Sequence, residues 1–223
     1  MYDRRTSNGR PLSTVLEENG VPRGAVDLIF RFFDFNQGRI VNVNTAVVVD
    51  YSQPSTQKRL LILDLKQGAV EKHYVSHGIN SGVVETRRFS NVVDSWQSSL
   101  GFYYAIGTYK SQKNGLSLYL EGLDRSNNAS KERAIVLHGA KYVSEQFIQQ
   151  NGRLGWSEGC LAVALEVAPR LIDMLKEGSV VLSFHKDLMV DSRRYPLWQE
   201  LAGQELVPPG VNMNRTPGEG GGL

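Results

Sequence analysis

The sequence of 223 residues has no long hydrophobic run and almost no net charge. Its longest apolar runs, residues 46–49 and 60–63, fall far short of the ~18 residues that a helix needs to cross a bilayer, so we expect no membrane span. Twenty-five Lys and Arg residues against twenty-three Asp and Glu residues leave a formal net charge of +2. So small a charge gives no general attraction to nucleic acid, and we expect no nucleic-acid partner.

The chain also lacks a second cysteine and an apolar leader. Because Cys160 is the single cysteine, no disulfide can form within the chain, and its thiol is either an inert packing group or a reactive one. Polar residues follow Met1 where a signal peptide would carry an apolar stretch. The chain as given is therefore expected to be cytosolic or to have lost its leader.

The composition itself is that of a globular protein, with 41% hydrophobic and 22% charged residues, which excludes a wholly disordered, collagen-like or coiled-coil chain. We expect three regions. Residues 1–40 form an N-terminal helical segment, residues 41–190 form the main domain, and residues 203–223 form a disordered tail rich in Gly and Pro.

The first region has two helix signals. Residues 14–17 match a capping box, and Pro22 is placed to open a second helix. Apolar residues between 26 and 33 then recur at the i, i+3, i+4, i+7 spacing of a helix that packs on a core.

From about residue 44 to 140, short β-branched and aromatic runs alternate with Gly, Ser and Asn, which is typical of an all-β sandwich or barrel. The connections between the second and third runs and between the fourth and fifth are too short for parallel crossovers, so both pairs are expected to be antiparallel hairpins. The six expected strands cover residues 45–51, 59–65, 69–76, 102–109, 116–120 and 134–137.

Beyond the β-rich region we expect two helices and a last strand. The helices cover residues 143–150, ending at Asn151-Gly152, and residues 167–176, and the strand covers residues 179–184. Residues 78–99 form the one long aperiodic loop inside the β-rich region, and such loops are usually functional or mobile. The expected fold class is mostly β, with helices at the periphery.

The residues best suited to chemistry lie between 135 and 160. An apolar strand delivers His138 at its end, and a glycine-rich loop then delivers Cys160. Cysteine is nucleophilic as the thiolate, and a neighbouring imidazole accepts its proton and stabilises the resulting charge. The backbone amides of Gly159 and Cys160 are candidates for binding an oxyanion formed beside the sulfur.

The alternative for a lone cysteine is a small buried hydrophobe without chemistry. The pattern Ser-x-Gly-Cys at 157–160, downstream of His138-Gly139, favours a nucleophile. The order of the residues excludes two other designs, because papain-type enzymes place the cysteine before the histidine and caspases surround it with a different motif.

This pattern resembles the active-site signature of the YkuD-type L,D-transpeptidases, and most closely the murein L,D-transpeptidase catalytic domain branch. The likeness extends from about Leu16 to Phe184. Besides His138-Gly139 and 157–160, the matching blocks are residues 50–55, 75–82, 89–91, 98–102, 115–118 and 152–155.

The resemblance implies an L,D-transpeptidase-like mixed β-sandwich and a reaction on peptidoglycan stem peptides. Cys160 would attack the carbonyl between the third and fourth residues of a donor stem, expel D-alanine, and pass the acyl group to an amine of an acceptor stem as a 3→3 cross-link. His138 would activate the thiol, and the Gly139 carbonyl would orient the imidazole. The resemblance implies no metal or organic cofactor, and it implies a location in the periplasm or cell envelope.

Four positions depart from the family pattern. Glu158 stands where many relatives have a basic residue, and Ala162 stands where Arg or Asn is common. Trp156 and Leu161 replace the Arg and Pro of the nearer branch. These departures bear on the carboxylate contacts and on the acceptor, whereas the Cys–His pair is intact.

Further candidates surround this pair. Trp156 and Tyr142 flank it and are expected to contact the stem peptide or to pack the loop onto the sheet, while residues 77–82 are expected to line the groove or to form a structural turn. The candidate substrate-binding or oxyanion residues are Gly159, Ser157, Trp156, Tyr142, His77, Asn80 and Ser81.

His73 and His77 have a helical metal spacing, but on a strand they would lie about 13 Å apart, so we expect no metal site. Two other functions remain open. The first is a carboxypeptidase or endopeptidase that hydrolyses the same thioester, and the second is a catalytically silent peptidoglycan-binding module. No sequence feature predicts an oligomeric state.

Overall fold

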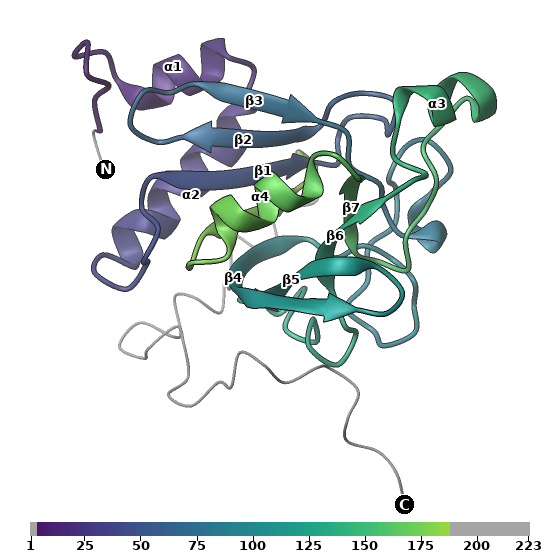
Figure 1. The fold of residues 1–223 in the computed structure, drawn as a ribbon. Coiled ribbons are helices and arrows are strands. Elements are labelled where there is room, and N and C mark those ends of the chain that lie inside the picture. Colours follow the sequence, from purple (N-terminus) through teal and green to yellow (C-terminus); the bar gives the residue numbers. More distant parts are fainter. Residues whose placement is uncertain (1–3, 188–223) are drawn as a thin grey trace, which may run out of the picture.

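The computed structural model describes residues 4–187, and its centre is a mixed sheet of eight strands in the order β3-β2-β1-β8-β4-β5-β6-β7 (Figure 1). The prediction of a mostly β fold with peripheral helices is confirmed. The tail predicted at 203–223 lies outside the described residues. The strands are β1 (Thr45–Asp50), β2 (Leu60–Asp64), β3 (Val70–His73), β4 (Gly101–Ser111), β5 (Gly115–Gly122), β6 (Val136–Ala140), β7 (Leu161–Ala164) and β8 (Val180–Phe184).

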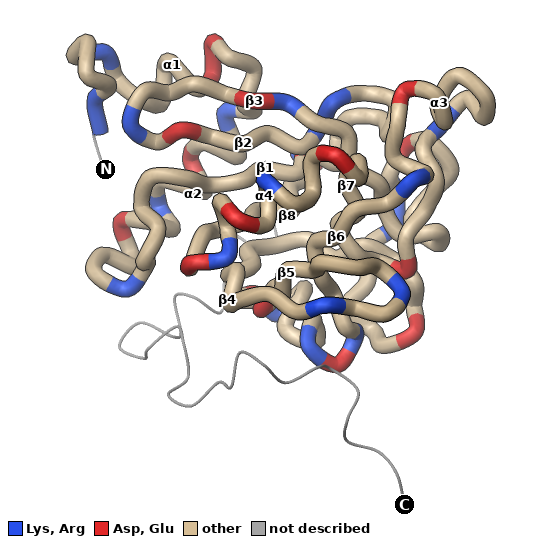
Figure 2. The backbone as a smooth tube through the Cα atoms, viewed as in Figure 1, with Lys and Arg blue, Asp and Glu red and all other residues tan. Residues whose placement is uncertain are grey.

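Five short helices accompany the sheet. They are α1 (Leu12–Glu18), α2 (Arg23–Phe35), the 3₁₀ turn η1 (Ile79–Ser81), α3 (Glu145–Asn151) and α4 (Ala168–Leu175). None of the helices within residues 4–187 is long and apolar enough to cross a membrane. Basic and acidic residues are interspersed along the described chain (Figure 2), in keeping with its small net charge.

The strand pairing combines predicted hairpins with two parallel contacts. The pairs β2–β3 and β4–β5 are antiparallel, as expected from their short connections. In contrast, β1 pairs with β8 and β6 pairs with β7 in parallel. The β6–β7 connection has room for this crossover because it contains α3.

Two local predictions are wrong, and one strand was not predicted. Helix α1 begins at Leu12 after Pro11 with no side-chain cap, so residues 14–17 are helix interior and form no capping box. His138 lies inside β6, not at the end of a strand, because pairing with β5 and β7 extends β6 to Ala140. The apolar residues after Cys160 form β7, a strand that periodicity did not reveal.

Other signals are confirmed. Pro22 directly precedes the first residue of α2, where a residue without an N–H leaves no helix donor unpaired. Gly152 ends α3 in the left-handed conformation, with φ 70°.

The N-terminal helices share a core with the sheet. Phe32 of α2 is fully buried and stacks on Phe102 of β4 with ring centroids 4.4 Å apart. Helix α2 packs against β8, and α4 packs against β5 and β6. Residues 4–35 therefore contribute to the stability of the sheet that carries the candidate site.

We expect Phe32→Ala to lower the free energy of unfolding by about 3–5 kcal/mol, because it removes a fully buried ring and leaves a cavity beside Phe102. Denaturant titration followed by tryptophan fluorescence measures this change. A loss below about 1 kcal/mol would show that α2 does not contribute to the core of the sheet.

Candidate active site

The pairing of β6 with β7 brings the segments of His138 and Cys160 together. The strands run parallel with His138 beside Ala162, and Cys160 lies two residues before Ala162, immediately ahead of β7. Because side chains alternate between faces along a strand and His138 pairs with Ala162, the strand pairing brings the segment that carries Cys160 next to β6, with Cys160 one residue before β7.

His138 is held as a neutral base. Its side chain is buried, and its Nδ1 lies 3.0 Å from the Gly139 carbonyl oxygen. A carbonyl can only accept, so Nδ1 carries the proton and Nε2 is the acceptor. Burial, followed by the charge of Lys113, lowers the pKa of His138 below its usual value, against the raising effect of the Gly139 carbonyl.

Gly139, the next residue of β6, packs tightly against Ala168 and Leu165. A Cβ at this position would lie 3.1 Å from side-chain atoms of both Ala168 and Leu165. Helix α4 and the segment before it therefore support β6 from behind, and this fixes the peptide whose carbonyl holds the imidazole.

The thiol of Cys160 is partly buried and donates to the Ala134 carbonyl oxygen at 3.5 Å. Burial raises the pKa of the Cys160 thiol, and Glu158 adds to this effect, whereas a backbone hydrogen bond from Val136 lowers it. Arg133 and Lys113 lower it as well. The thiol and the imidazole are therefore both neutral at rest, and the thiol hydrogen is directed at Ala134.

The loop before Cys160 is a turn held by Ser157. The Ser157 hydroxyl donates to the Cys160 carbonyl oxygen at 2.7 Å and accepts from the Gly159 N–H at 3.2 Å. The Gly159 amide is thus occupied and does not fit the oxyanion role expected for it, because its hydrogen already has a partner. The expectation for the Cys160 amide is unaffected.

Gly159 itself is required by both conformation and space. Its φ of 115° is rarely adopted by other residues, and a Cβ would lie 2.8 Å from the Gln97 carbonyl oxygen and 3.0 Å from Nη2 of Arg133.

We expect Gly159→Ala to lower the free energy of unfolding by about 1–3 kcal/mol, because the strain cannot be relieved without moving the backbone at Gln97. It should also slow alkylation of Cys160 by displacing the adjacent thiol. Denaturant titration and thiol labelling measure the two effects, and Gly9→Ala is a matched control because a Cβ at Gly9, another positive-φ glycine, meets no atom within 4 Å. Equal effects of the two substitutions would contradict a specific requirement at Gly159.

His77 lies in the loop after β3, and its side chain is buried, with 1% exposed. Its Nδ1 lies 2.8 Å from Nη2 of Arg59, so Nδ1 accepts, and its Nε2 donates to the Gly82 carbonyl oxygen at 3.0 Å. Burial, with the charge of Arg59, lowers the pKa of His77 to about 4. His77 is therefore a neutral residue that holds the loop, and its side chain is not available to a substrate.

Asn80 and Ser81 also hold this loop. Asn80 Nδ2 donates to the Ser95 carbonyl oxygen at 3.0 Å, and the fully buried Ser81 hydroxyl accepts from the Ser98 N–H at 2.8 Å. Both side chains connect residues 79–81 to residues 95–98, so the long loop predicted between 78 and 99 is cross-linked to itself.

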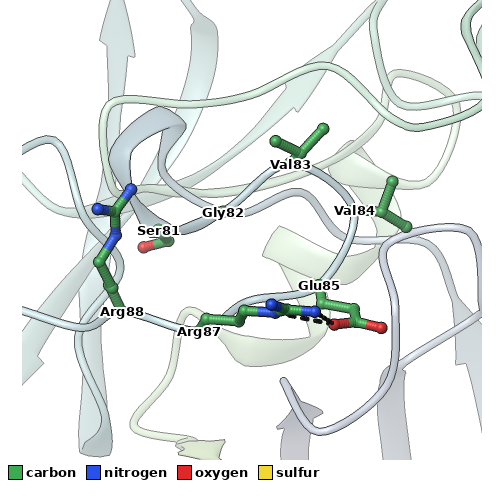
Figure 3. A pocket seen from close by; sticks show the side chains of 7 residues that line it. All are labelled: Ser81, Gly82, Val83, Val84, Glu85, Arg87 and Arg88. Carbon is green, nitrogen blue, oxygen red and sulfur yellow. Dashed lines mark hydrogen bonds and ion pairs between the residues drawn. The ribbon is translucent and has the colours of Figure 1, made fainter.

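A pocket of about 640 Å³ opens in the same loop (Figure 3). Glu85 and Arg87 form an ion pair on its wall, as the dashed lines in Figure 3 show. Of the predicted site residues, Ser81 lines it, whereas Cys160 and His138 do not. Its lining residues are Ser81, Gly82, Val83, Val84, Glu85, Arg87 and Arg88.

Trp156 and Tyr142 connect the cysteine loop to its surroundings. Trp156 Nε1 donates to the Val83 carbonyl oxygen at 3.1 Å, and the Arg153 guanidinium lies over the Trp156 ring, 3.3 Å from its centroid. Burial raises the pKa of Tyr142 to about 12, and the charge of Cys160 is the next cause. Trp156 therefore joins the loop to the pocket wall, and the Tyr142 phenol interacts electrostatically with Cys160.

The structure adds residues that the sequence did not indicate. The fully buried Arg59 donates to the carbonyl oxygens of Gln53 and Val75 and to the Thr86 hydroxyl. The one sequence feature that could have indicated Arg59 is that it is a charged residue at the start of an apolar strand. Arg133 and Lys113 act on the thiol from two different loops, and nothing in their local sequence marks them.

Within residues 4–187, no three or more His, Cys, Asp or Glu side chains are grouped closely enough to hold a metal ion. His73 and His77 have separate partners. His73 Nε2 lies 2.7 Å from a carboxylate oxygen of Glu71, whereas His77 contacts Arg59 and Gly82.

Several solved structures share a remote likeness with this chain. An L,D-transpeptidase from Mycobacterium smegmatis is 11% identical over 63% of this chain and 58% of its own, with a TM-score of 0.39. An L,D-transpeptidase from Stackebrandtia nassauensis is 17% identical over 78% of this chain and 76% of its own, with a TM-score of 0.39. The helical cell shape determining protein of Campylobacter jejuni is 14% identical over 75% of this chain and 58% of its own, with a TM-score of 0.42.

The match thus spans less than two thirds of the mycobacterial and Campylobacter proteins. A comparison with curated protein sequences gives no match. The family model of the L,D-transpeptidase catalytic domain matches residues 18–184, which include every strand of the sheet and both His138 and Cys160. The chain therefore belongs to the L,D-transpeptidase catalytic domain family.

Proposed function

We propose that this chain is a cysteine-dependent L,D-transpeptidase that acts on peptidoglycan tetrapeptide stems through a thioester on Cys160. The observation that supports this proposal is that Cys160 lies immediately ahead of β7, which pairs in parallel with the strand that carries His138, and that Nε2 of this imidazole is the acceptor. Family membership supplies the substrate class.

The first half-reaction starts from the neutral pair. Rotation about the Cα–Cβ bond of Cys160 takes the thiol from the Ala134 carbonyl toward Nε2 of His138, which accepts the proton as sulfur attacks the carbonyl between the third and fourth stem residues. The C–N bond breaks as the tetrahedral intermediate collapses. His138 returns its proton to the amine of the departing D-alanine, and a thioester remains on Cys160.

In the second half-reaction an amine of the acceptor stem attacks the thioester. His138 accepts the amine proton and passes it to the sulfur as the C–S bond breaks, which restores the thiol and completes a 3→3 cross-link. The substrate lies outside the inner membrane, so we place the working enzyme in the periplasm or cell envelope, with donor and acceptor stems as its partners.

Intact-protein mass spectrometry after mixing the chain with a disaccharide-tetrapeptide, followed by product chromatography, tests this function. A Cys160-linked acyl adduct, free D-alanine and a 3→3 dimer are expected. Tripeptide without dimer would replace the transpeptidase by a carboxypeptidase, because water would then resolve the thioester. No adduct and no product from folded protein would overturn the proposal in favour of a silent binding module.

A further inference from the structure

Arg133, in the segment before β6, makes four hydrogen bonds to the long loop that precedes β4. Its Nη1 donates to the Ser90 carbonyl oxygen at 2.7 Å and to the Ser99 hydroxyl at 2.6 Å. Its Nη2 donates to the Gln97 carbonyl oxygen and to the Ser95 hydroxyl, the latter at 3.4 Å. All four acceptors are uncharged, so the guanidinium holds the loop without losing its charge to a carboxylate.

The uncompensated charge lies beside the nucleophile. Among the described residues 4–187, no carboxylate forms an ion pair with Arg133, whereas Lys113 is paired with Glu158 at 2.9 Å. A Cβ on Gly159, the residue before Cys160, would lie 3.0 Å from Nη2 of Arg133. The following residue, Ala134, accepts the hydrogen bond from the thiol. Contacts on both sides therefore place Arg133 against the cysteine loop.

We infer that Arg133 is a positioning residue that holds residues 90–99 against the cysteine loop and, through its fixed positive charge, stabilises negative charge on the Cys160 sulfur. This inference rests on the proposed function for its catalytic meaning. Both nitrogens of the Nη pair are already engaged by the loop, so Arg133 acts as a fixed charge and not as a ligand for substrate carboxylates.

The electrostatic environment supports this role. Arg133 is half-buried, where water screens its charge less than at the surface. Its charge lowers the pKa of the Cys160 thiol. Burial lowers the pKa of Arg133 itself, and the charges of Tyr103 and then Cys160 partly offset this effect. Besides His138, the proposed base, the other titratable groups that interact electrostatically with Cys160 are Glu158, Lys113, Tyr51, Tyr109 and Tyr142.

The rate of iodoacetamide alkylation of Cys160 as a function of pH tests this inference on the full chain without any substrate. Arg133→Gln removes the charge and keeps a donor, whereas Arg133→Lys keeps the charge and loses the fork of hydrogen bonds. We expect the Gln variant to shift the alkylation profile to higher pH by on the order of a half to one pH unit. The rate of alkylation at pH 8 should then be about threefold to tenfold slower than that of the wild type. The Lys variant should retain the wild-type profile within about twofold, although it should unfold at a lower temperature because the fork of hydrogen bonds is lost.

Arg170→Gln is the matched control, because Arg170 pairs with Glu71 and is not among the groups that act on the thiol. Its profile should be that of the wild type. An unshifted profile for folded Arg133→Gln would overturn the inference, and if that variant does not fold, a shift of a full pH unit in Arg133→Lys would overturn it as well. A shifted profile in a chain that releases no D-alanine would instead leave the inference standing and refute the proposed function.

Discussion

Replacement of Cys160 by alanine should reduce D-alanine release and dimer formation by on the order of 10⁴-fold or more, because no other group can form the thioester. The structure indicates little loss of fold. The sulfur makes only weak backbone contacts, a hydrogen bond to the Ala134 carbonyl oxygen at 3.5 Å and one from Val136, while the turn before it is held by Ser157 and by the backbone. Product chromatography and denaturant titration on the same preparation separate activity from stability.

Cys160→Ser is the complementary variant. A serine hydroxyl keeps the size and the hydrogen bond to Ala134, but its proton is held far more tightly than that of a thiol, so His138 cannot activate it. We expect both variants to bind stem peptide and to release no D-alanine. Turnover by either at a rate near the wild type would eliminate Cys160 as the nucleophile.

Replacement of His138 by glutamine should reduce turnover by about 10²–10⁴-fold, because the amide can donate to the Gly139 carbonyl but cannot accept the thiol proton. The remaining nucleophile should also become slower to alkylate near neutral pH. His73→Gln is the control, since His73 contacts Glu71 at the edge of the sheet and does not point at the sulfur. Equal losses in the two variants would argue against a specific role for His138.

The lowered pKa of His138 predicts the acid limit of activity. Burial penalises the imidazolium, so the pKa of His138 lies below the ordinary value of 6.5. The neutral base therefore persists as the pH falls through 6.5, and activity should be lost only as the pH passes the lowered pKa. A kcat/KM profile from pH 4 to 9 measures this limit, and an acid limb centred above pH 6.5 would contradict it.

Local patterns predicted most elements of the sheet. Alternating and apolar runs located β1, β2, β4, β5 and β8, and turn residues identified both hairpins. Helix ends were predicted where a residue has a strong backbone preference, as Pro22 and Gly152 do. The capping box failed because Ser and Thr patterns near helix starts are common, and tertiary contacts selected an earlier start at Leu12.

Strand β7 shows where local patterns stop being informative. Its four residues are all buried, so it has no alternation, and its length alone does not distinguish a strand from a buried helical turn. Its parallel pairing with β6 joins residues separated by α3, a contact that no local pattern contains. The same pairing extends β6 beyond His138 and moves this residue from the predicted strand end into the sheet.

The candidate nucleophile and base follow from the sequence, because a single cysteine after Ser-x-Gly and a histidine before glycine are local features that match a family pattern. The surrounding roles do not. In the structure His77 is hydrogen-bonded to Arg59, and the Gly159 amide donates to the Ser157 hydroxyl. Arg133 lies against Gly159, the residue before the thiol. These roles depend on which loops meet in space, since burial and hydrogen-bond partners from distant segments decide whether a polar side chain faces a substrate or holds the chain. The sequence by itself thus predicted the nucleophile and base proposed for the site, and the tertiary structure decided their electrostatic environment.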